Sequence, residues 1–147
     1  MIHRRRFIVG VAGGLLSVPF AAAQQVARMP RIGVLLSGGG GTGAANLSTE
    51  VLRQGLKELG YVEGRTAVLE WRSWEGKPER LREAVAGLMR LKPDVIVVGG
   101  SEAARALKEA TRSIPVVFVG PSYPVEEGLV ESFARPGGNI TGITLAQ

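Results

Sequence analysis

Arg31-Ile-Gly-Val-Leu-Leu36 followed by Ser37-Gly-Gly-Gly-Gly-Thr-Gly43 is the stretch from which the organisation of the chain follows. The first part is a short apolar run, typical of a buried parallel strand. The glycine run frees the backbone to adopt unusual φ values. An amphipathic helix is expected next, ending at Gly60 as a C′ glycine, with an apolar stripe of Leu47, Val51, Leu52, Leu56 and Leu59. Ligands bind where parallel strands end, so the first wall of a binding site is expected at residues 37–42.

Strand-like and helix-like segments alternate through the rest of the chain. Strands are expected at residues 66–72, 94–98, 116–119 and 140–145. One helix is expected from Pro78 to a stop at Pro93. A second is expected after Ser101, with a packed face of Ala103, Ala104, Leu107 and Ala110. One or two helical turns are expected at 128–133. This order predicts an α/β fold with a doubly wound parallel sheet in three αβα layers. The 66–72 strand is expected near an edge and the 94–98 strand in the centre.

Composition excludes several kinds of chemistry. The formal net charge is +5, but Arg4, Arg5 and Arg6 supply three of those charges, and no basic run follows them. Nucleic acid is therefore not an expected partner. The chain has no cysteine, and its only histidine is His3. Without these residues the chain cannot build a Ser-His triad or a typical zinc site, so no catalytic residue, metal or cofactor is expected.

Residues 1–23 have the layout of an export signal. Three arginines precede an apolar run at 7–20, and Ala21-Ala-Ala23 gives an A-x-A cleavage pattern before Gln24. The run is shorter than the roughly 20 residues that span a membrane. Arg4, Arg5 and Phe7 also resemble a twin-arginine motif, so both that route and general secretion stay open. Cleavage near Ala23–Gln24 predicts a periplasmic mature domain at 24–147 with no membrane span; an uncleaved anchor and a core helix remain the alternatives.

Two short motifs have competing interpretations. Gly38-x-Gly40-x-x-Gly43 matches a dinucleotide fingerprint, with Glu70 as a candidate ribose acid 27 residues beyond Gly43, more than the usual spacing of about 20. No lysine follows Gly43, so it is not a Walker loop. Gly99-Gly-Ser-Glu-Ala103 resembles a nucleophile elbow without a histidine base. Ser101 is therefore expected to be a helix N-cap, either as a cap alone or with its hydroxyl and the neighbouring N–H groups also facing a ligand.

Two tryptophans flank the end of the second expected strand. Trp71 is a candidate for the core, and Trp74, in the following loop, is a candidate for stacking on a ligand or for packing alone.

Several longer segments carry a family resemblance. They are Arg31-Ile-Gly-Val-Leu35, Arg53-Gln-Gly-Leu-Lys-Glu-Leu-Gly-Tyr-Val-Glu-Gly64, Trp71-Arg-Ser-Trp-Glu-Gly76, Ile114-Pro-Val-Val-Phe118 and Gly128-Leu-Val-Glu-Ser-Phe-Ala-Arg-Pro-Gly-Gly-Asn-Ile-Thr-Gly142. In this order they resemble the ABC-transporter substrate-binding proteins of the tryptophan/tyrosine-binding-like type. The resemblance covers the whole chain.

The resemblance implies a type I periplasmic binding fold, in which two lobes close on a small molecule such as an amino acid and deliver it to an ABC permease in the inner membrane. By position it places cleft loops at Ser37 and Gly38, at 99–101 with Gly100 and Ser101, and at Gly120, Pro121 and Ser122. Members of the family are about twice as long, so this chain is expected to correspond to the N-terminal lobe only. The glycine-rich loop at 38–43 departs from the family pattern.

Two other functions stay open from the sequence. One is a periplasmic Rossmann-like enzyme domain that binds a nucleotide cofactor, which the fingerprint at Gly38 would support. The other is a gene fragment with no function of its own, since the chain stops just after the apolar segment at 140–145.

Overall fold

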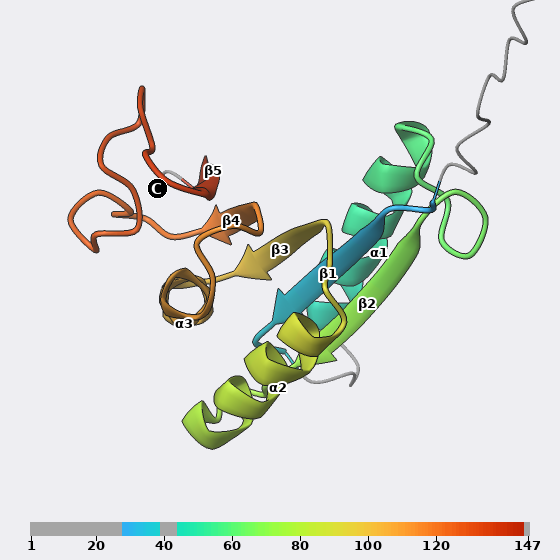
Figure 1. Cartoon of the computed structure of the whole chain (residues 1–147), viewed down its shortest axis with the longest axis horizontal. Helices are drawn as coiled ribbons and strands as arrows, with labels where there is room; N and C mark the ends of the chain where they lie inside the picture. The colour runs from blue at the N-terminus through green and yellow to red at the C-terminus, as the bar shows by residue number, and fades with distance from the viewer. Residues whose placement is uncertain (1–27, 39–43, 146–147) are drawn as a thin grey trace, which may run out of the picture.

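A five-stranded parallel sheet organises the protein, as the sequence predicts (Figure 1). The computed structural model describes residues 28–38 and 44–145. The strands are β1 (Arg31–Leu36), β2 (Val68–Ser73), β3 (Val95–Gly99), β4 (Val116–Gly120) and β5 (Ile140–Thr144), and the helices are α1 (Ala44–Glu58), α2 (Pro78–Arg90) and α3 (Ser101–Ala110). The strand order is β2-β1-β3-β4-β5. The predicted α/β doubly wound class is confirmed, and β2 lies at an edge of the described sheet.

The topology contains one switch point. β1 lies between β2 and β3, and Val34 is in register with Trp71 on one side and with Val97 on the other. From β1 the chain moves outward to β2 and then returns past β1 to β3. In doubly wound sheets the crevice for a ligand opens where the strand order reverses, at the carboxyl ends of the strands. Here that position is between the ends of β1 and β3.

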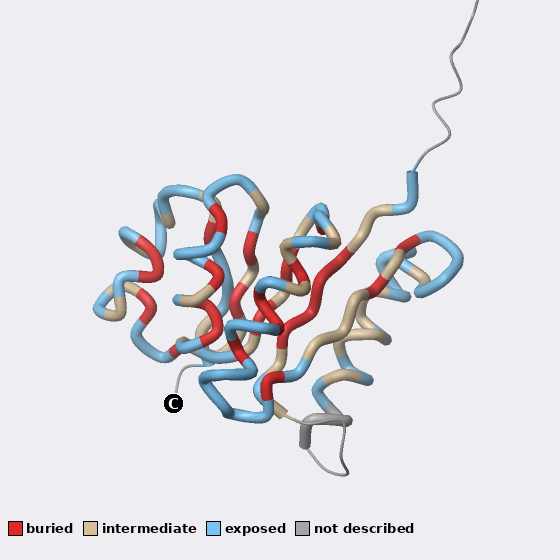
Figure 2. The backbone as a smooth tube through the Cα atoms, turned by 60° about the horizontal axis from the view of Figure 1, so that its bottom comes forward, coloured by how far each residue is buried: buried red, intermediate tan, exposed pale blue. Residues whose placement is uncertain are grey.

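Alternate residues of the strands contribute to two separate cores. Figure 2 marks in red the parts of the backbone where buried residues lie. Ile32 and Val34 face α1, where they pack with Ala67 and Leu69 of the β2 side. Leu35 faces the opposite side, which α2 and α3 cover. The members of this larger core include Ile96, Val98, Val116 and Phe118 from the sheet, Leu81, Val85 and Leu88 from α2, and Ala103, Ala104 and Leu107 from α3. Helices on both faces give the expected αβα layers.

The end of α1 follows a glycine stop. Gly60 has φ +90°, which an L side chain rarely adopts. The N–H of Tyr61 donates to the carbonyl of Leu56 at 2.8 Å, and the N–H of Gly60 donates to Lys57 at 3.0 Å. This pair of bonds is a Schellman motif, so Gly60 is the C′ glycine that the sequence predicts.

Not every residue of the predicted apolar stripes is buried. Val51 is 64% exposed and Leu59 is 76% exposed, whereas Leu52 and Leu56 pack on the smaller core. Ala110 on α3 is exposed as well. The expectation for these three residues is wrong: Leu52 and Leu56, and not Val51, pack α1 on the smaller core, Leu59 lies beyond the end of α1, and Ala110 is the last residue of α3.

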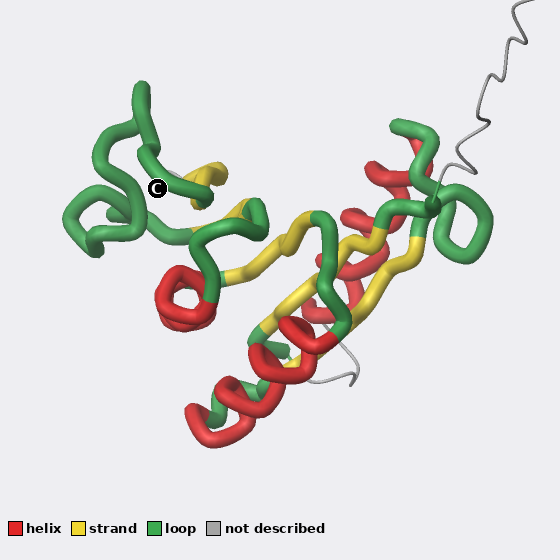
Figure 3. Tube along the Cα trace, viewed as in Figure 1, coloured by secondary structure: helices red, strands yellow, loops and turns green. Residues whose placement is uncertain are grey.

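The short helix expected at 128–133 is also wrong. The whole segment between β4 and β5 is loop and turn (Figure 3). The carbonyl of Pro124 accepts N–H groups from both Leu129 and Val130, and Gly128 has φ +67°, so the backbone closes a turn instead of continuing as a helix. Leu129 and Val130 are nevertheless buried in the larger core. The apolar pattern therefore predicts which residues are buried, whereas the positive φ of Gly128 decides that the backbone forms a turn.

Two sequence expectations lie outside the described residues. They are the export signal at 1–23 and the greater part of the glycine fingerprint, which falls at 39–43. Among the helices at 44–145, none combines the length and apolar character needed to cross a bilayer.

Asp94, the only aspartate of the chain, joins the start of β3 to the start of β1. Its Oδ2 accepts the backbone N–H of Arg31 at 2.7 Å, and its Oδ1 lies 3.1 Å from Arg28 Nη2. The Arg31 N–H, together with the positive charges of Arg28 and Arg31, lowers the pKa of Asp94 below its ordinary value of 3.8. A carboxyl with a lowered pKa stabilises the folded state above that ordinary value and loses this contribution as the pH falls through the folded-state pKa.

Asp94→Asn is therefore expected to lower Tm at pH 7 and to differ less and less from the parent chain below pH about 4. Thermal denaturation between pH 7 and pH 2 measures this. Arg28→Gln is the companion variant. It is expected to have the smaller effect, because the backbone N–H of Arg31 is the largest cause of the shift. A Tm difference for Asp94→Asn that stays constant down to pH 2 would contradict the expectation.

Candidate functional site

A cavity of about 670 Å³ opens at the switch point. Its floor is formed by the carboxyl ends of β1, β3 and β4, and one wall comes from α1. The residues that line it are Leu36, Ser37, Gly38, Ser48, Val51, Leu52, Val97, Val98, Gly99, Gly100, Val119 and Leu145. This volume falls within the range of sites for small ligands.

Three of the candidate residues from the sequence meet in this cavity. Ser37 and Gly38 follow β1, and Gly100 follows β3. They come together because β1 and β3 are neighbours in the sheet and both end at the same edge. Parallel pairing is thus sufficient to bring these two loops to one site.

Gly100 positions the start of α3. Its φ of +84° turns the chain from β3 into the helix, and its N–H donates to the carbonyl of Val119 at 3.1 Å. Gly100 is the N-cap residue and makes no side-chain cap. The expectation that Ser101 is the N-cap is wrong: Ser101 is the first residue of the helix, because the turn requires the positive φ of the glycine before it. Ser101 does not line the cavity.

The third predicted loop lies beside the cavity but does not line it. Gly120 has φ +108°, and a Cβ placed there would lie 3.9 Å from the backbone nitrogen of Gly100. The next residue, Pro121, is buried, and Ser122 is exposed. The structure therefore brings this loop next to the β3 loop, while the cavity reaches only Val119 of β4.

Trp74 lies in the core instead of the cavity. It is 5% exposed and packs with Leu81 and Val85 of α2. Its backbone N–H donates to the carbonyl of Leu36 at 3.2 Å. This bond holds the loop after β2 against the end of β1, with the Trp74 side chain on the α2 face of the sheet. The structure does not place it for ligand stacking, and packing alone is the interpretation that it supports.

A polar clamp fixes α1 beside β2. The guanidinium of Arg53 lies 5.0 Å from the ring centroid of Trp71, and its Nε is 2.9 Å from Glu63 Oε2. The Trp71 Nε1–H donates to Glu63 Oε1 at 3.0 Å. The bond to Glu63 raises the pKa of Arg53 further above its ordinary value. Trp71, a candidate for the core, is half-buried, and the clamp holds the helix that carries the cavity wall.

Eight lining residues were not among the candidates from the sequence, and four of them are strand residues (Leu36, Val97, Val98 and Val119). Ser48, Val51 and Leu52 come from α1, and Leu145 follows β5. The sequence placed Val51 and Leu52 on a stripe facing the core. The sequence did hold one signal for these α1 residues. The apolar stripe of the helix is wide and holds more apolar residues than a helix over two strands can bury.

The lining determines what the cavity can bind. None of its lining residues in the described part carries an ionisable side chain, and most are apolar or glycine. The polar groups are the hydroxyls of Ser37 and Ser48 and the backbone near the start of α3. A helix start without a side-chain cap favours a negatively charged group nearby. The site therefore suits a small molecule with an apolar body and an anionic end.

Glu70 is not placed for ribose recognition. It lies in the middle of β2, in register with Gly33, and not at the carboxyl end of the strand. Its Oε1 is 3.8 Å from Arg31 Nε, and its Oε2 is 4.0 Å from Arg72 Nη1. The carboxylate is thus part of a charge network on the outer edge of the sheet. Within residues 28–38 and 44–145, no group of acidic, His or Cys side chains is arranged to hold a metal.

Comparisons with known proteins agree with this architecture. The family model described as "ABC transporter substrate binding protein" matches residues 43–147. A tyrosine-binding protein of Clostridioides difficile is 29% identical over 87 residues, which are 59% of this chain and 25% of that protein.

Solved structures show the same fold. A conserved domain protein from Vibrio cholerae matches 81% of this chain with a TM-score of 0.74 and 28% identity. An ABC domain from Streptococcus pneumonia in complex with L-Trp matches 78% with a TM-score of 0.71 and 27% identity. This chain spans 40% and 38% of those two chains, respectively. It therefore corresponds to less than half of each of these solved chains.

Proposed function

This chain belongs to the family of ABC transporter substrate binding proteins, and we propose that it forms the first lobe of a solute-binding component that delivers a small molecule, such as an amino acid, to an ABC permease in the inner membrane. The cavity between the ends of β1 and β3 carries the proposal. Its apolar walls suit an aromatic or aliphatic side chain, and the start of α3 suits a carboxylate. Export through the signal at 1–23 would place the domain in the periplasm.

The names of two relatives support an aromatic amino acid as the solute. One is a tyrosine-binding protein and the other was solved with L-Trp. Both are much longer than this chain, so we infer that a second lobe supplies the opposite wall. A lobe that provides half of the enclosing contacts is expected to bind weakly, with a Kd of about 1 mM or above.

Titration with L-tryptophan, followed by ¹H–¹⁵N NMR of the 147-residue chain, tests the proposal. The amide signals of Gly38, Gly99 and Gly100 are expected to move most, because these residues line the cavity. L-Alanine is the control ligand and is expected to cause smaller shifts, since it lacks the large apolar body. Shifts that scatter over the surface, or that gather on another face, would refute the assignment of this cavity.

A charge placed on the α1 wall is expected to weaken this binding. Val51→Arg puts a cation and its hydration into the cavity, and it should weaken the L-tryptophan response at least about tenfold. Because Val51 is 64% exposed, Tm should change little. Leu59→Arg is the matched control: Leu59 is 76% exposed, immediately follows α1 and lies outside the cavity lining. Equal binding by Val51→Arg and the parent chain would exclude α1 from the site.

A further inference from the structure

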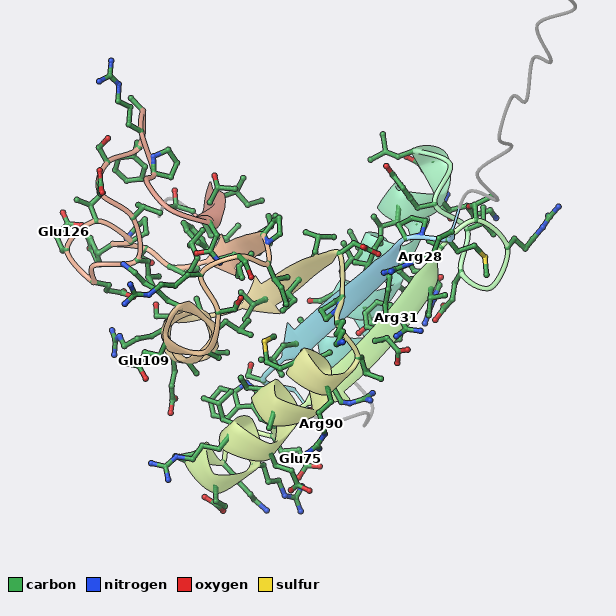
Figure 4. The ribbon with its side chains drawn as sticks, in the orientation of Figure 1. Arg28, Arg31, Glu75, Arg90, Glu109 and Glu126 are labelled. Carbon is green, nitrogen blue, oxygen red and sulfur yellow. The ribbon has the colours of Figure 1, made fainter. Side chains whose placement is uncertain are left out.

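Two guanidinium groups converge over Gly87, in the last turn of α2. A Cβ built on Gly87 would lie 3.8 Å from Arg72 Nε and 3.9 Å from Arg90 Nη2. Arg72 comes from β2 and Arg90 from the last turn of α2. Figure 4 shows Arg90 reaching from α2 toward the side of the molecule formed by β2. Two cations from different elements therefore share one small space.

That space belongs to a hollow of about 600 Å³ between the edge strand and the helix. Its lining residues are Arg72, Ser73, Arg80, Glu83, Ala84, Gly87, Arg90 and Leu91. They include three arginines and one carboxylate. The hollow lies on the α2 face of the sheet, opposite the face that α1 covers. It is thus separate from the cavity at the strand ends.

The positive charge in this hollow is only partly compensated. Arg80 pairs with Glu75. The carboxylate nearest to Arg72 is Glu70, at 4.0 Å, and Arg72 Nη1 donates to the carbonyl of Trp71 at 2.8 Å. The side chain of Arg90 has no ion pair or hydrogen bond with any residue in the described part of the chain. An anion held between Arg72 and Arg90 would supply the missing partner.

Gly87 keeps the space between the guanidiniums open. Glycine is the least favourable residue inside a helix after proline. Neither a positive φ nor a close contact requires it here, because a Cβ at Gly87 would meet its neighbours only at ordinary distances. Its lack of a side chain has one local consequence, which is room for a ligand atom within reach of both arginines.

A second hollow continues the positive charge beyond Arg90. It has a volume of about 500 Å³ and shares Arg90 and Leu91 with the first. Arg28, Arg31 and Lys92 also line it. Arg28 pairs with Asp94, and Arg31 Nη1 donates to the carbonyl of Leu91 at 2.7 Å. Asp94 and Glu70 offset part of the charge of Arg28 and Arg31, so the second hollow adds a smaller positive field on the far side of Arg90.

We propose that Arg72 and Arg90 bind an oxyanion, a phosphate or carboxylate group, over Gly87. The planar guanidinium matches both groups with paired N–H donors. Arg80 and Arg31 add positive charge that Glu75 and Glu70 partly offset, and Glu83 is the one carboxylate among the described residues that line the hollow. The site is independent of the solute cavity, so an amino acid in that cavity and an anion here can bind together.

The 147-residue chain titrated with sodium phosphate at constant ionic strength tests the site by ¹H–¹⁵N NMR. The amides of Ser73 and Gly87 are expected to shift in a saturable way, and Arg90→Gln should weaken the response about tenfold or more. Arg82→Gln is the matched control, since Arg82 is an exposed arginine of α2 that lines a different hollow. Equal weakening by both variants, or shifts that do not saturate, would overturn the site.

Gly87→Ala separates binding from folding. The added methyl should raise Tm, because alanine favours the helix, yet it should weaken phosphate binding severalfold by filling the space between the guanidiniums. A variant that binds phosphate as the parent does would overturn the role of Gly87.

Acetate and lipid vesicles identify the natural source of the oxyanion. Amide shifts that saturate on titration with acetate would identify the bound group as a carboxylate. Sedimentation with phosphatidylglycerol vesicles, but not with phosphatidylcholine vesicles, and its loss in Arg90→Gln, assign a lipid headgroup. Binding of inorganic phosphate without vesicle binding assigns a free anion. Failure of all three probes would overturn the proposal.

Discussion

Replacing Gly142 by alanine is expected to destabilise the folded chain by about 3 kcal/mol and to lower Tm by about 10 °C. Gly142 lies in β5, directly in register with Phe118 of β4. A Cβ at this position would overlap the carbonyl oxygen of Phe118 and would lie 2.5 Å from the ring carbons Cγ and Cδ2. Phe118 is buried in the larger core and cannot move aside without disturbing it.

The same substitution elsewhere provides the control. Gly55 lies on α1, and a Cβ there would meet no atom within 4 Å. Gly55→Ala should therefore stabilise the chain by up to about 1 kcal/mol, because alanine favours a helix. Thermal and urea denaturation of the two variants should show that the same glycine-to-alanine change destabilises the chain at position 142 and stabilises it at position 55. A Gly142→Ala variant as stable as the parent chain would show that β5 does not pair with β4 in this register.

Leu88→Ala is expected to reduce the free energy of unfolding by about 3–4 kcal/mol. Leu88 is fully buried on α2, at the centre of the larger core. A Cβ built on Gly33 of β1 would lie 3.2 Å from Leu88 Cδ2, which shows how closely the helix approaches the central strand. Removing the side chain leaves a cavity that neither the strand nor the helix can close. Leu59→Ala, at a 76% exposed position, should change stability by less than about 0.5 kcal/mol.

A double-mutant cycle identifies the contact itself. Gly33→Ala alone should destabilise, since its Cβ would meet Leu88 Cδ2 at 3.2 Å and Ile96 Cγ1 at 3.3 Å. In the Leu88→Ala background the first of these contacts disappears, so the same substitution should cost less. Additive effects in urea denaturation would mean that α2 does not rest on β1 through these two residues.

The fold could be predicted because its local signals agree with one another. The run at 95–98 is apolar without polar alternation, and it forms β3 in the centre of the sheet. Pro78 begins α2 and Gly60 follows the end of α1, as their backbone preferences require. The end of the first strand indicated Ser37 and Gly38, the family resemblance indicated Gly100, and the strand order brings these two loops together.

The remaining parts of the site depend on long-range packing. Whether Val51 faces a core or a cavity depends on how far the sheet extends beneath α1, which no local pattern records. Trp74 has the composition of a ligand-stacking residue, yet the loop after β2 turns it under the sheet. At Ser101 and at 128–133, a glycine with positive φ overrides the neighbouring preference for a cap or a helix.

The two tryptophans give the protein a specific optical response. Trp74 is in an apolar core, and its indole N–H has no hydrogen-bond partner among the described residues, so its emission should lie at short wavelength and move to the red on unfolding. Trp71 is held between the charges of Arg53 and Glu63, so its intensity should report the docking of α1. Neither indole lines the cavity. Intrinsic fluorescence of this chain therefore follows folding and helix docking, and a solute that enters the cavity without moving α1 leaves it unchanged.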